Sequence, residues 1–486
     1  MRYISTRGMS PPVSAPEALL SGMAPDGGLY LPEDLPDLSH LLFIPLPYPL
    51  LASEVFKALL PGFTEKELEG AARDAYAGAF DTPEVTPLVS VKGIRFLELF
   101  HGPTGSFKDI ALQALPRLMA LARDKLDVKK EYLVLTATSG DTGSSAMQGF
   151  RGVPGFKVLV YYPRDGVSTV QKLQMTTMPG GNVQAVGVRG NFDDAQAGVK
   201  AVFARGGEGL PPNILLSSAN SINIGRLIPQ IVYYVYACRE LLHSGDMQTG
   251  ERIDFVVPTG NFGDSLAGYL AKRMGMPIGQ LVCASNFNSV LTDFLQTGFF
   301  DRRRPLFPTL SPSMDILAPS NLERLLYLAS GNDAGEVRRM MTVFGKYGCY
   351  TAGESAMRLI RETFTGFSAT DPQTLDGIRI MWEANRYLMD PHTAAAHHAL
   401  SMLPHLPHLA VTLATASPFK FPRTICRALG MPLPDDESRL PGQLARMARR
   451  PLPSSLRNLA RRAELHKDVI GKDEIVGDAL RRAASW

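Results

Sequence analysis

One lysine of the chain lies in a segment whose residue types could bind an anion or form a covalent bond. The segment is HGPTGSFKD at residues 101–109, which follows an apolar run, precedes a helical pattern and contains Lys108. A lysine at the carboxyl-terminal edge of a strand can bind phosphate as a point charge or form a Schiff base with a carbonyl group. The segment by itself leaves open a surface lysine in the first turn of a helix.

Two further segments rich in glycine and hydroxyl groups follow predicted strands. TATSGDTGSS at residues 136–145 exposes backbone N–H groups at the start of a helix, which suits a carboxylate or a phosphate, but an ordinary capping loop is the alternative. TGNFGD at residues 259–264 allows the backbone to wrap a phosphate, yet it is neither a Walker loop nor a dinucleotide fingerprint. Asp264 taken alone is typical of a helix cap.

These segments lie where short apolar runs alternate with longer helical patterns. The predicted helices cover residues 110–123, 144–150, 193–204, 224–240 and 265–274. The predicted strands are Ile94–Phe100, Tyr132–Thr136, Lys157–Tyr162, Asn182–Val188, Ile253–Pro258, Gln280–Ala284 and His408–Thr415. This alternation predicts a doubly wound α/β sheet, in which ligands bind at the carboxyl ends of the strands.

The first ninety residues differ from this central pattern. Residues 1–90 predict a mainly helical N-terminal unit, with helices over Glu17–Met23 and Lys66–Ala77. The prolines between Pro32 and Pro61 indicate that the stretch linking these helices is mostly loop.

The end of the chain differs as well. Residues 91–430 form the predicted catalytic domain, and residues 431–486 form a C-terminal helical extension. Within the extension, residues 439–467 carry seven arginines and one lysine against Glu464. Because no aromatic residue is interleaved there to stack on bases, we interpret this segment as a solvated helical face rather than a nucleic-acid patch.

Composition excludes several classes of protein. The 486 residues carry 50 basic and 47 acidic side chains, a net charge of +3 that is too balanced for a partner such as nucleic acid or a membrane surface. The longest nearly apolar stretch, residues 227–238, is shorter than the ~18 residues that a membrane span needs. The N-terminus lacks the apolar core of a secretion signal, and the four cysteines have neither disulfide nor zinc spacing. We therefore expect a cytoplasmic enzyme without a metal.

The three segments together, in this order and spacing, resemble the threonine synthase family of pyridoxal-phosphate enzymes. Further segments resemble the same family: MRYISTRG at the N-terminus, APDGGLYLP at 24–32, NSINIGRL at 220–227, SMDI at 313–316, DPHTA at 390–394 and TLATASPFKF at 412–421. The resemblance implies fold type II: an α/β protein with doubly wound, mostly parallel sheets in two lobes.

The resemblance also implies roles for individual residues. Lys108 is the implied Schiff-base lysine, and Thr415 is implied to meet the pyridine nitrogen of pyridoxal 5'-phosphate. Asp141 is implied to face the 3-oxygen of the cofactor. The phosphate cup is implied to comprise Gly260, Asn261, Phe262, Gly263 and Asp264. The implied substrate-binding residues are Thr138, Ser139, Gly140 and Thr142, with Ser168 and Arg226 as candidates for the substrate phosphate.

The implied reaction converts O-phosphohomoserine and water to threonine and phosphate, the last step of threonine biosynthesis. Two alternatives remain open at the level of the sequence. A phospholyase or dehydratase of the same fold would eliminate phosphate without adding water at Cβ. A binding protein that has lost turnover is the other alternative, against which Lys108 argues. We expect a small-molecule substrate as the partner, and a monomer or a homodimer.

Overall fold

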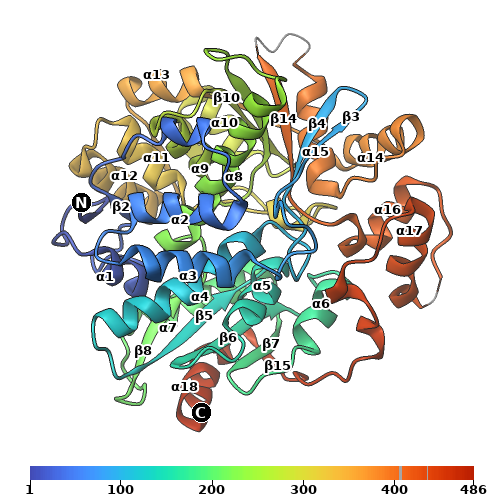
Figure 1. Ribbon diagram of the computed structural model, residues 1–486. Helices are drawn as coiled ribbons and strands as arrows, with labels where there is room; N and C mark the ends of the chain where they lie inside the picture. The colour runs from blue at the N-terminus through green and yellow to red at the C-terminus, as the bar shows by residue number, and fades with distance from the viewer. Residues whose placement is uncertain (404–407, 435) are drawn as a thin grey trace.

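The computed structural model describes residues 1–403, 408–434 and 436–486 of the protein, whose elements are drawn in Figure 1. One lobe is built on a six-stranded sheet with the strand order β13-β10-β9-β14-β4-β3. In that order the strands are Phe364–Ser368, Ile278–Ser285, Ile253–Pro258, Leu409–Ala414, Ile94–Glu98 and Leu88–Val91. Only the edge strand β3 runs antiparallel to its neighbour, and the other pairs are parallel.

The other lobe is built on a five-stranded, fully parallel sheet with the order β15-β7-β6-β5-β8. These strands are Val469–Gly471, Val183–Arg189, Phe156–Pro163, Glu131–Ala137 and Ile214–Ser218. The runs YLVLTA in β5 and VLVYYP in β6 are buried throughout, as expected for parallel strands that are covered by helices on both faces. The prediction of mostly parallel sheets in two lobes is confirmed.

Helices cover both sheets, and α2 and α3 cross the front of the molecule between the two lobes in Figure 1. The helices that bear on the site are α4 (Lys108–Lys125), α5 (Asp141–Phe150), α6 (Thr169–Thr176), α8 (Ile224–Ser244) and α9 (Gly263–Arg273). The others are α1 (Ala15–Ser21), α2 (Tyr48–Leu59), α3 (Glu65–Tyr76), α7 (Phe192–Ala204), α10 (Val290–Thr297), α11 (Leu322–Ala329), α12 (Ala334–Tyr347), α13 (Glu354–Thr363), α14 (Asp371–Asn385), α15 (Pro391–Ser401), α16 (Pro422–Ala428), α17 (Leu440–Ala448) and α18 (Ile475–Ser485). Two short antiparallel pairs complete the fold: β1 (Tyr3–Ser5) with β2 (Tyr30–Pro32), and β11 (Phe299–Asp301) with β12 (Cys349–Thr351). Among the described residues, none of these helices has the length and apolarity that crossing a membrane requires.

Helix α2 corrects the expectation that residues between Pro32 and Pro61 are mostly loop. Pro49 lies in the first turn of α2, where a missing N–H leaves no helical hydrogen bond unmade. The proline-free run that follows buries Leu51, Val55, Phe56 and Leu59 on one face. A proline count alone therefore underestimated the helical content of the N-terminal unit.

Helices α4 and α5 approach each other closely, because of one proline and one glycine. Pro116 lies inside α4 and has no N–H, so the carbonyl of Leu112 lacks the helical donor that residue 116 normally supplies. A Cβ atom at Gly149 of α5 would lie 1.9 Å from that carbonyl oxygen. Only glycine fits this contact, which brings together the two helices whose first residues are Lys108 and Asp141.

The C-terminal segment is more than a helical extension. Its strand β15 pairs with β7 and thereby extends the five-stranded sheet, and α18 packs on α7 at Gly198, where a Cβ would meet Ile475 at 2.4 Å. The arginine-rich stretch contains α17 and short 3₁₀ turns, and its Leu456 and Leu459 are buried. Six of the seven arginines and Lys467 are exposed, which agrees with a solvated face, although only part of the segment is helical and its leucines pack inward.

Candidate active site

A pocket lies at the carboxyl ends of the strands β4, β5, β9 and β14, which is the edge that the fold offers to ligands. Its walls combine the segments that follow these strands with side chains from α8 and from the stretch after β11. The lining residues include Phe107, Lys108, Thr138, Ser139, Asp141, Thr142, Arg226, Gln230, Gly260, Asn261, Phe262, Gly263, Asp264, Ser313, His392 and Thr415. Segments far apart in the sequence thus meet at one cavity, as the sequence predicted.

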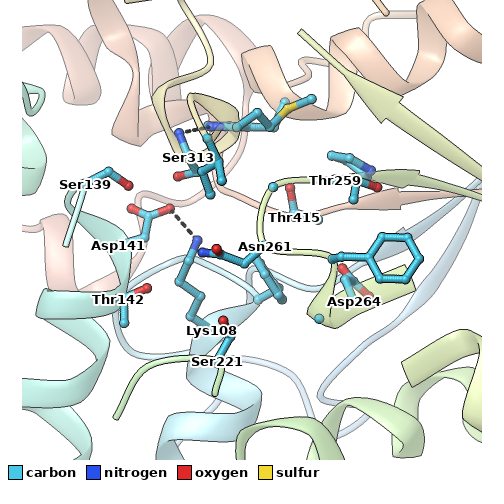
Figure 2. Close-up of a pocket in the computed structure, with 18 of the residues that line it drawn as sticks. Lys108, Ser139, Asp141, Thr142, Ser221, Thr259, Asn261, Asp264, Ser313 and Thr415 are labelled. Atoms are coloured by element: carbon cyan, nitrogen blue, oxygen red, sulfur yellow. Dashed lines mark hydrogen bonds and ion pairs between the residues drawn. The ribbon is translucent and has the colours of Figure 1, made fainter. Parts of the chain in front are cut away.

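Lys108 is the first residue of α4, and its side chain reaches between Asp141 and Asn261 in Figure 2. The backbone is fixed there because the Phe107 N–H donates to the carbonyl of Thr415 at 2.8 Å. The ammonium Nζ lies 3.6 Å from Asp141 Oδ2, and the side chain is 12% exposed. Burial lowers the pKa of Lys108, although Asp141 opposes the shift. The alternative of a solvated surface lysine is therefore wrong.

Asp141 is the first residue of α5, and each of its carboxylate oxygens has a partner. Oδ1 accepts hydrogen bonds from the Lys420 ammonium at 2.9 Å and from Gln171 Nε2 at 2.7 Å, while Oδ2 faces Lys108. Burial alone would raise the pKa of Asp141, but Lys420 and Lys108 hold it well below its usual range. Its two cationic neighbours therefore favour the charged form of this carboxylate, whose charge the sequence left open.

Residues 260–263 form a tight loop at the amino-terminal end of α9. Phe262 has a φ of 62°, in the left-handed region, and a Cβ at Gly260 would lie 2.5 Å from the carbonyl oxygen of Ser313. The carbonyl of Asn261 accepts from the Asn321 N–H at 3.1 Å, which holds the loop against the start of α11. Backbone N–H groups at the start of the eleven-residue helix α9 suit a phosphate group.

Asp264 is buried in the wall of this loop and is held by two tyrosines of α8. Its Oδ1 accepts hydrogen bonds from the hydroxyls of Tyr233 and Tyr234. Burial raises the pKa of Asp264 to about 6, even though both tyrosine hydrogen bonds favour the charged form. Asp264 thus fastens the loop of residues 260–263 to α8, in addition to lining the pocket.

Thr415 directly follows β14 and lines the pocket with a side chain that is almost buried. Its carbonyl is engaged by Phe107, whereas its hydroxyl has no hydrogen-bond partner among the described residues. This geometry leaves the hydroxyl available to a ligand atom. The alternative, a hydroxyl satisfied by the backbone, is not what the structure contains.

The residues predicted to bind substrate in the loop after β5 fall into two groups with different positions. Thr138 Oγ1 accepts from the N–H groups of Gly140 and Gly143, both at 2.9 Å, so this hydroxyl holds the loop together. Gly140 has a φ of 124° and packs against Gln171 rather than lining the pocket. Ser139 and Thr142 line the pocket and lie beside Asp141 in Figure 2.

The two candidates for a substrate phosphate have different positions. Arg226 on α8 lines the pocket and is buried, with Nη1 donating to the carbonyl of Ala219 at 2.6 Å and Nε without a partner among the described residues. Ser168 does not line the pocket, which corrects its prediction as a substrate ligand. Its hydroxyl caps α6 by accepting from the Gln171 N–H and donates to the carbonyl of Lys420.

Sequence reasoning missed three residues at or behind the pocket: Lys420, Gln171 and His392. His392 lines the pocket, with Nδ1 2.7 Å from Asp390 Oδ1, while its Nε2 accepts from the Ser313 N–H at 3.2 Å. Among the described residues, no group of histidine, cysteine, aspartate or glutamate has the geometry of a metal site. Lys420 and His392 both lie in segments that resemble the family. A charged or polar residue in such a segment could therefore have been selected as a candidate from the sequence.

The residues present fit a cofactor that carries an aldehyde, a phosphate and a ring nitrogen. A buried lysine with a lowered pKa suits the aldehyde, the loop of residues 260–263 suits the phosphate, and the unpaired Thr415 hydroxyl suits the nitrogen. The fit rests on three separate segments of one pocket.

Comparisons with known proteins identify the class to which this fold and pocket belong. A family model described as pyridoxal-phosphate dependent enzyme matches residues 80–412. Models for the threonine synthase N terminus and C-terminal region match residues 2–76 and 393–470. The fold and the site therefore define a pyridoxal-phosphate-dependent enzyme.

Individual relatives narrow the assignment. A threonine synthase of Pseudomonas aeruginosa is 39% identical over 436 residues, covering 88% of this chain and 90% of the relative. One of Saccharomyces cerevisiae is 37% identical, covering 88% and 89%. The crystal structure of pyridoxal-phosphate-bound threonine synthase from Brucella melitensis superposes over both full chains with a TM-score of 0.87 and 36% identity. The chain belongs to the threonine synthase family.

Proposed function

We propose that the protein converts O-phospho-L-homoserine and water to L-threonine and phosphate in the pocket around Lys108. The observation that carries the proposal is the position of the Lys108 amine, buried in the pocket between Asp141 and the glycine-rich loop that begins α9. Membership of the threonine synthase family supports the choice of substrate.

The proposed cofactor cradle uses residues from four segments of the chain. Lys108 attaches the cofactor aldehyde, the loop of residues 260–263 binds its phosphate, and the Thr415 hydroxyl meets its ring nitrogen. Asp141 faces the 3-oxygen side. When it is bound, pyridoxal phosphate supplies the electron sink that makes loss of a proton from Cα feasible.

Lys108 is the proposed proton carrier of the reaction. As a neutral amine it would take a proton from the substrate Cα and afterwards one from Cβ, and the γ-phosphate would leave with its bridging oxygen. A proton would then be delivered to Cγ, the hydroxyl of water would add at Cβ, and a proton would be returned to Cα. The lowered pKa of Lys108 supports this role, because only the unprotonated amine can accept a proton.

Anionic groups of the substrate are assigned to the cationic and hydrogen-bonding side chains of the pocket. Arg226 is the proposed partner of the substrate phosphate, since its buried guanidinium retains an unused Nε–H. Ser139 and Thr142 are the proposed partners of the substrate carboxylate at the start of α5.

A cytoplasmic location is also part of the proposal. The four cysteines are all free, and Cys238, Cys283 and Cys426 are buried. Free thiols without disulfides are typical of proteins in a reducing compartment.

Product analysis tests the proposed function. The protein is incubated with pyridoxal phosphate and O-phospho-L-homoserine, and released phosphate and amino-acid products are quantified, with Lys108→Ala as the matched control. We expect equal amounts of threonine and phosphate from the native chain and neither from the control. Phosphate accompanied by a 2-oxo acid instead of threonine would indicate the phospholyase alternative. Bound cofactor without turnover would indicate a binding protein.

A further inference from the structure

Lys420 is a second lysine beside the pocket, and the proposed reaction gives it no role. Its side chain is completely buried, and it follows β14 in a short 3₁₀ turn, five residues after Thr415. The ammonium donates to Asp141 Oδ1 at 2.9 Å and to the carbonyl of Thr104 at 2.8 Å. Lys420 does not line the pocket, so it can influence bound molecules only through its neighbours.

Asp141 is shared by two lysines on opposite oxygens. Lys420 contacts Oδ1 at hydrogen-bond distance, whereas Lys108 lies 3.6 Å from Oδ2, beyond a strong hydrogen bond. The carboxylate is 2% exposed, and a buried charge without a partner is costly. If Lys420 were absent, Lys108 would be the only cationic contact of Asp141 within the described part of the chain.

We propose that Lys420 is a positioning residue that serves as the permanent counter-ion of Asp141 and so keeps Lys108 free to lose its proton. The inference rests on the proposed role of Lys108, and it names Lys420 as the residue that keeps Lys108 ready for this role. With its charge balanced by Lys420, Asp141 holds the Lys108 ammonium weakly. Repulsion between the two buried ammonium groups acts in the same direction.

Other charged groups around the two lysines do not replace this arrangement. The groups that face them are Asp109 on α4, Asp141 on α5, Arg226 on α8 and Asp264 on α9. Asp109 is occupied by the N–H and hydroxyl of Thr104. Asp264 accepts hydrogen bonds from both tyrosine hydroxyls of α8 on Oδ1, its Oδ2 has no hydrogen-bond partner among the described residues, and it forms no ion pair with either lysine there. Asp141 is therefore the only carboxylate among these that contacts both lysines.

The variant Lys420→Met removes the charge while keeping most of the buried contacts of the side chain. Methionine has a similar length, and the carbonyl of Thr104 keeps a second donor, because Gln174 Nε2 also lies 2.9 Å from it. Asp141 keeps its hydrogen bond from Gln171. Lys420→Arg retains the charge and serves as the rescue variant. Lys157→Met, which removes an ion-paired lysine of β6 outside the pocket, is the matched control.

The test measures how readily Lys108 is deprotonated, without requiring turnover. The full-length chain is freed of cofactor and mixed with pyridoxal phosphate at a series of pH values. Attachment needs the neutral amine, whose lone pair attacks the aldehyde with loss of one water, and borohydride then reduces the carbon–nitrogen double bond. The amount of labelled Lys108 peptide at early times gives the pH midpoint of attachment.

We expect Lys420→Met to raise this midpoint by at least about one pH unit, which at neutral pH means roughly tenfold slower attachment. Lys420→Arg and Lys157→Met should keep the native midpoint. Combining Lys420→Met with Asp141→Asn should return the midpoint toward the native value, because the carboxylate that captures Lys108 is gone.

An unchanged midpoint in Lys420→Met, with the label still on Lys108, would overturn the inference and leave the proposed function intact. A lowered unfolding midpoint without any shift in pH dependence would likewise assign Lys420 a structural role only. Label on another lysine would instead overturn the proposed function, so the two failures are distinguishable.

Discussion

The Lys108 amine and the carboxylate of Asp141 lie together on side chains that are 12% and 2% exposed, and the chemistry proposed for the pocket depends on this pair. Replacing Lys108 with Ala removes the only amine that lines the pocket among the described residues. We expect complete loss of threonine formation, with a melting temperature close to the native value, since the side chain makes one long ion pair. Steady-state assays and calorimetry provide the two measurements. Native turnover in Lys108→Ala would contradict the assignment.

Thr415 provides a second prediction, because its hydroxyl is unpaired in the pocket. Thr415→Val keeps the shape of the side chain and would remove the hydrogen bond that we propose to the cofactor nitrogen. Leaving that buried partner unpaired should weaken pyridoxal-phosphate binding by about 1–3 kcal/mol. Equilibrium titration of cofactor absorbance measures the change. Native affinity in this variant would make Thr415 a structural residue that ends a strand.

The residues of the site were predictable from sequence where one loop carries the chemistry. Lys108, the loop 260–264 and Thr415 each follow a strand, which places them at one edge of the sheet, but the choice of these residues rested on the resemblance to the family. Gln171 and Lys420 act on Asp141 from other elements, and only the packing of α6 and of the segment after β14 places them there. Ser168 does not line the pocket, and its hydroxyl caps α6 and donates to the carbonyl of Lys420, a long-range contact that residue type alone does not predict.

At the scale of elements, the loop at the start of α9, which approaches Ser313 closely at Gly260, is the proposed determinant of cofactor affinity. A valine at Gly260 would place its Cβ 2.5 Å from the Ser313 carbonyl oxygen, and the loop must shift to relieve the clash. We expect Gly260→Val to weaken pyridoxal-phosphate binding at least tenfold, or ~1.4 kcal/mol. Gly181→Val is the matched control, since a Cβ there meets no neighbour within 4 Å. Equal cofactor affinities in the two variants would show that this loop does not determine cofactor binding.

The elements themselves were predictable to different degrees. Long buried strands such as β5, β6 and β9 can be recognised in the sequence as apolar runs between turn signals. Strand β8 (ILLSS) and strand β13 (FTGFS) are short and partly polar, and β15 has three residues, so their strand character comes from pairing with neighbours. These three segments could be assigned as strands only from their pairing in the folded sheet.

At the scale of the whole molecule, His101 links the N-terminal unit to the catalytic sheet. Its Nδ1 lies 2.6 Å from Asp81, which follows α3, and its Nε2 lies 2.9 Å from Glu98 at the end of β4. Burial alone would lower the pKa of His101, but the two carboxylates raise it to about 9. Since 6.5 is the ordinary value, the folded chain binds this proton more tightly than the unfolded chain does.

This proton linkage predicts a pH-dependent stability. The contribution of His101 is present in full below about pH 6.5 and is lost as the pH rises through about 9. Between these limits the unfolding free energy of the native chain should fall by on the order of 1–2 kcal/mol more than that of His101→Asn, allowing for solvent screening. Denaturant titrations across this range measure the difference. Parallel pH profiles for the two proteins would contradict the linkage.

The central claim is that the pocket releases phosphate by breaking the Cγ–O bond and then adds water at Cβ. The most direct test runs the reaction with O-phospho-L-homoserine in ¹⁸O-labelled water and analyses both products by mass spectrometry. The account predicts threonine with one ¹⁸O in its hydroxyl group, and an equal amount of phosphate without the label. Label in the phosphate, or homoserine in place of threonine, would show simple hydrolysis of the phosphate ester and would contradict the account.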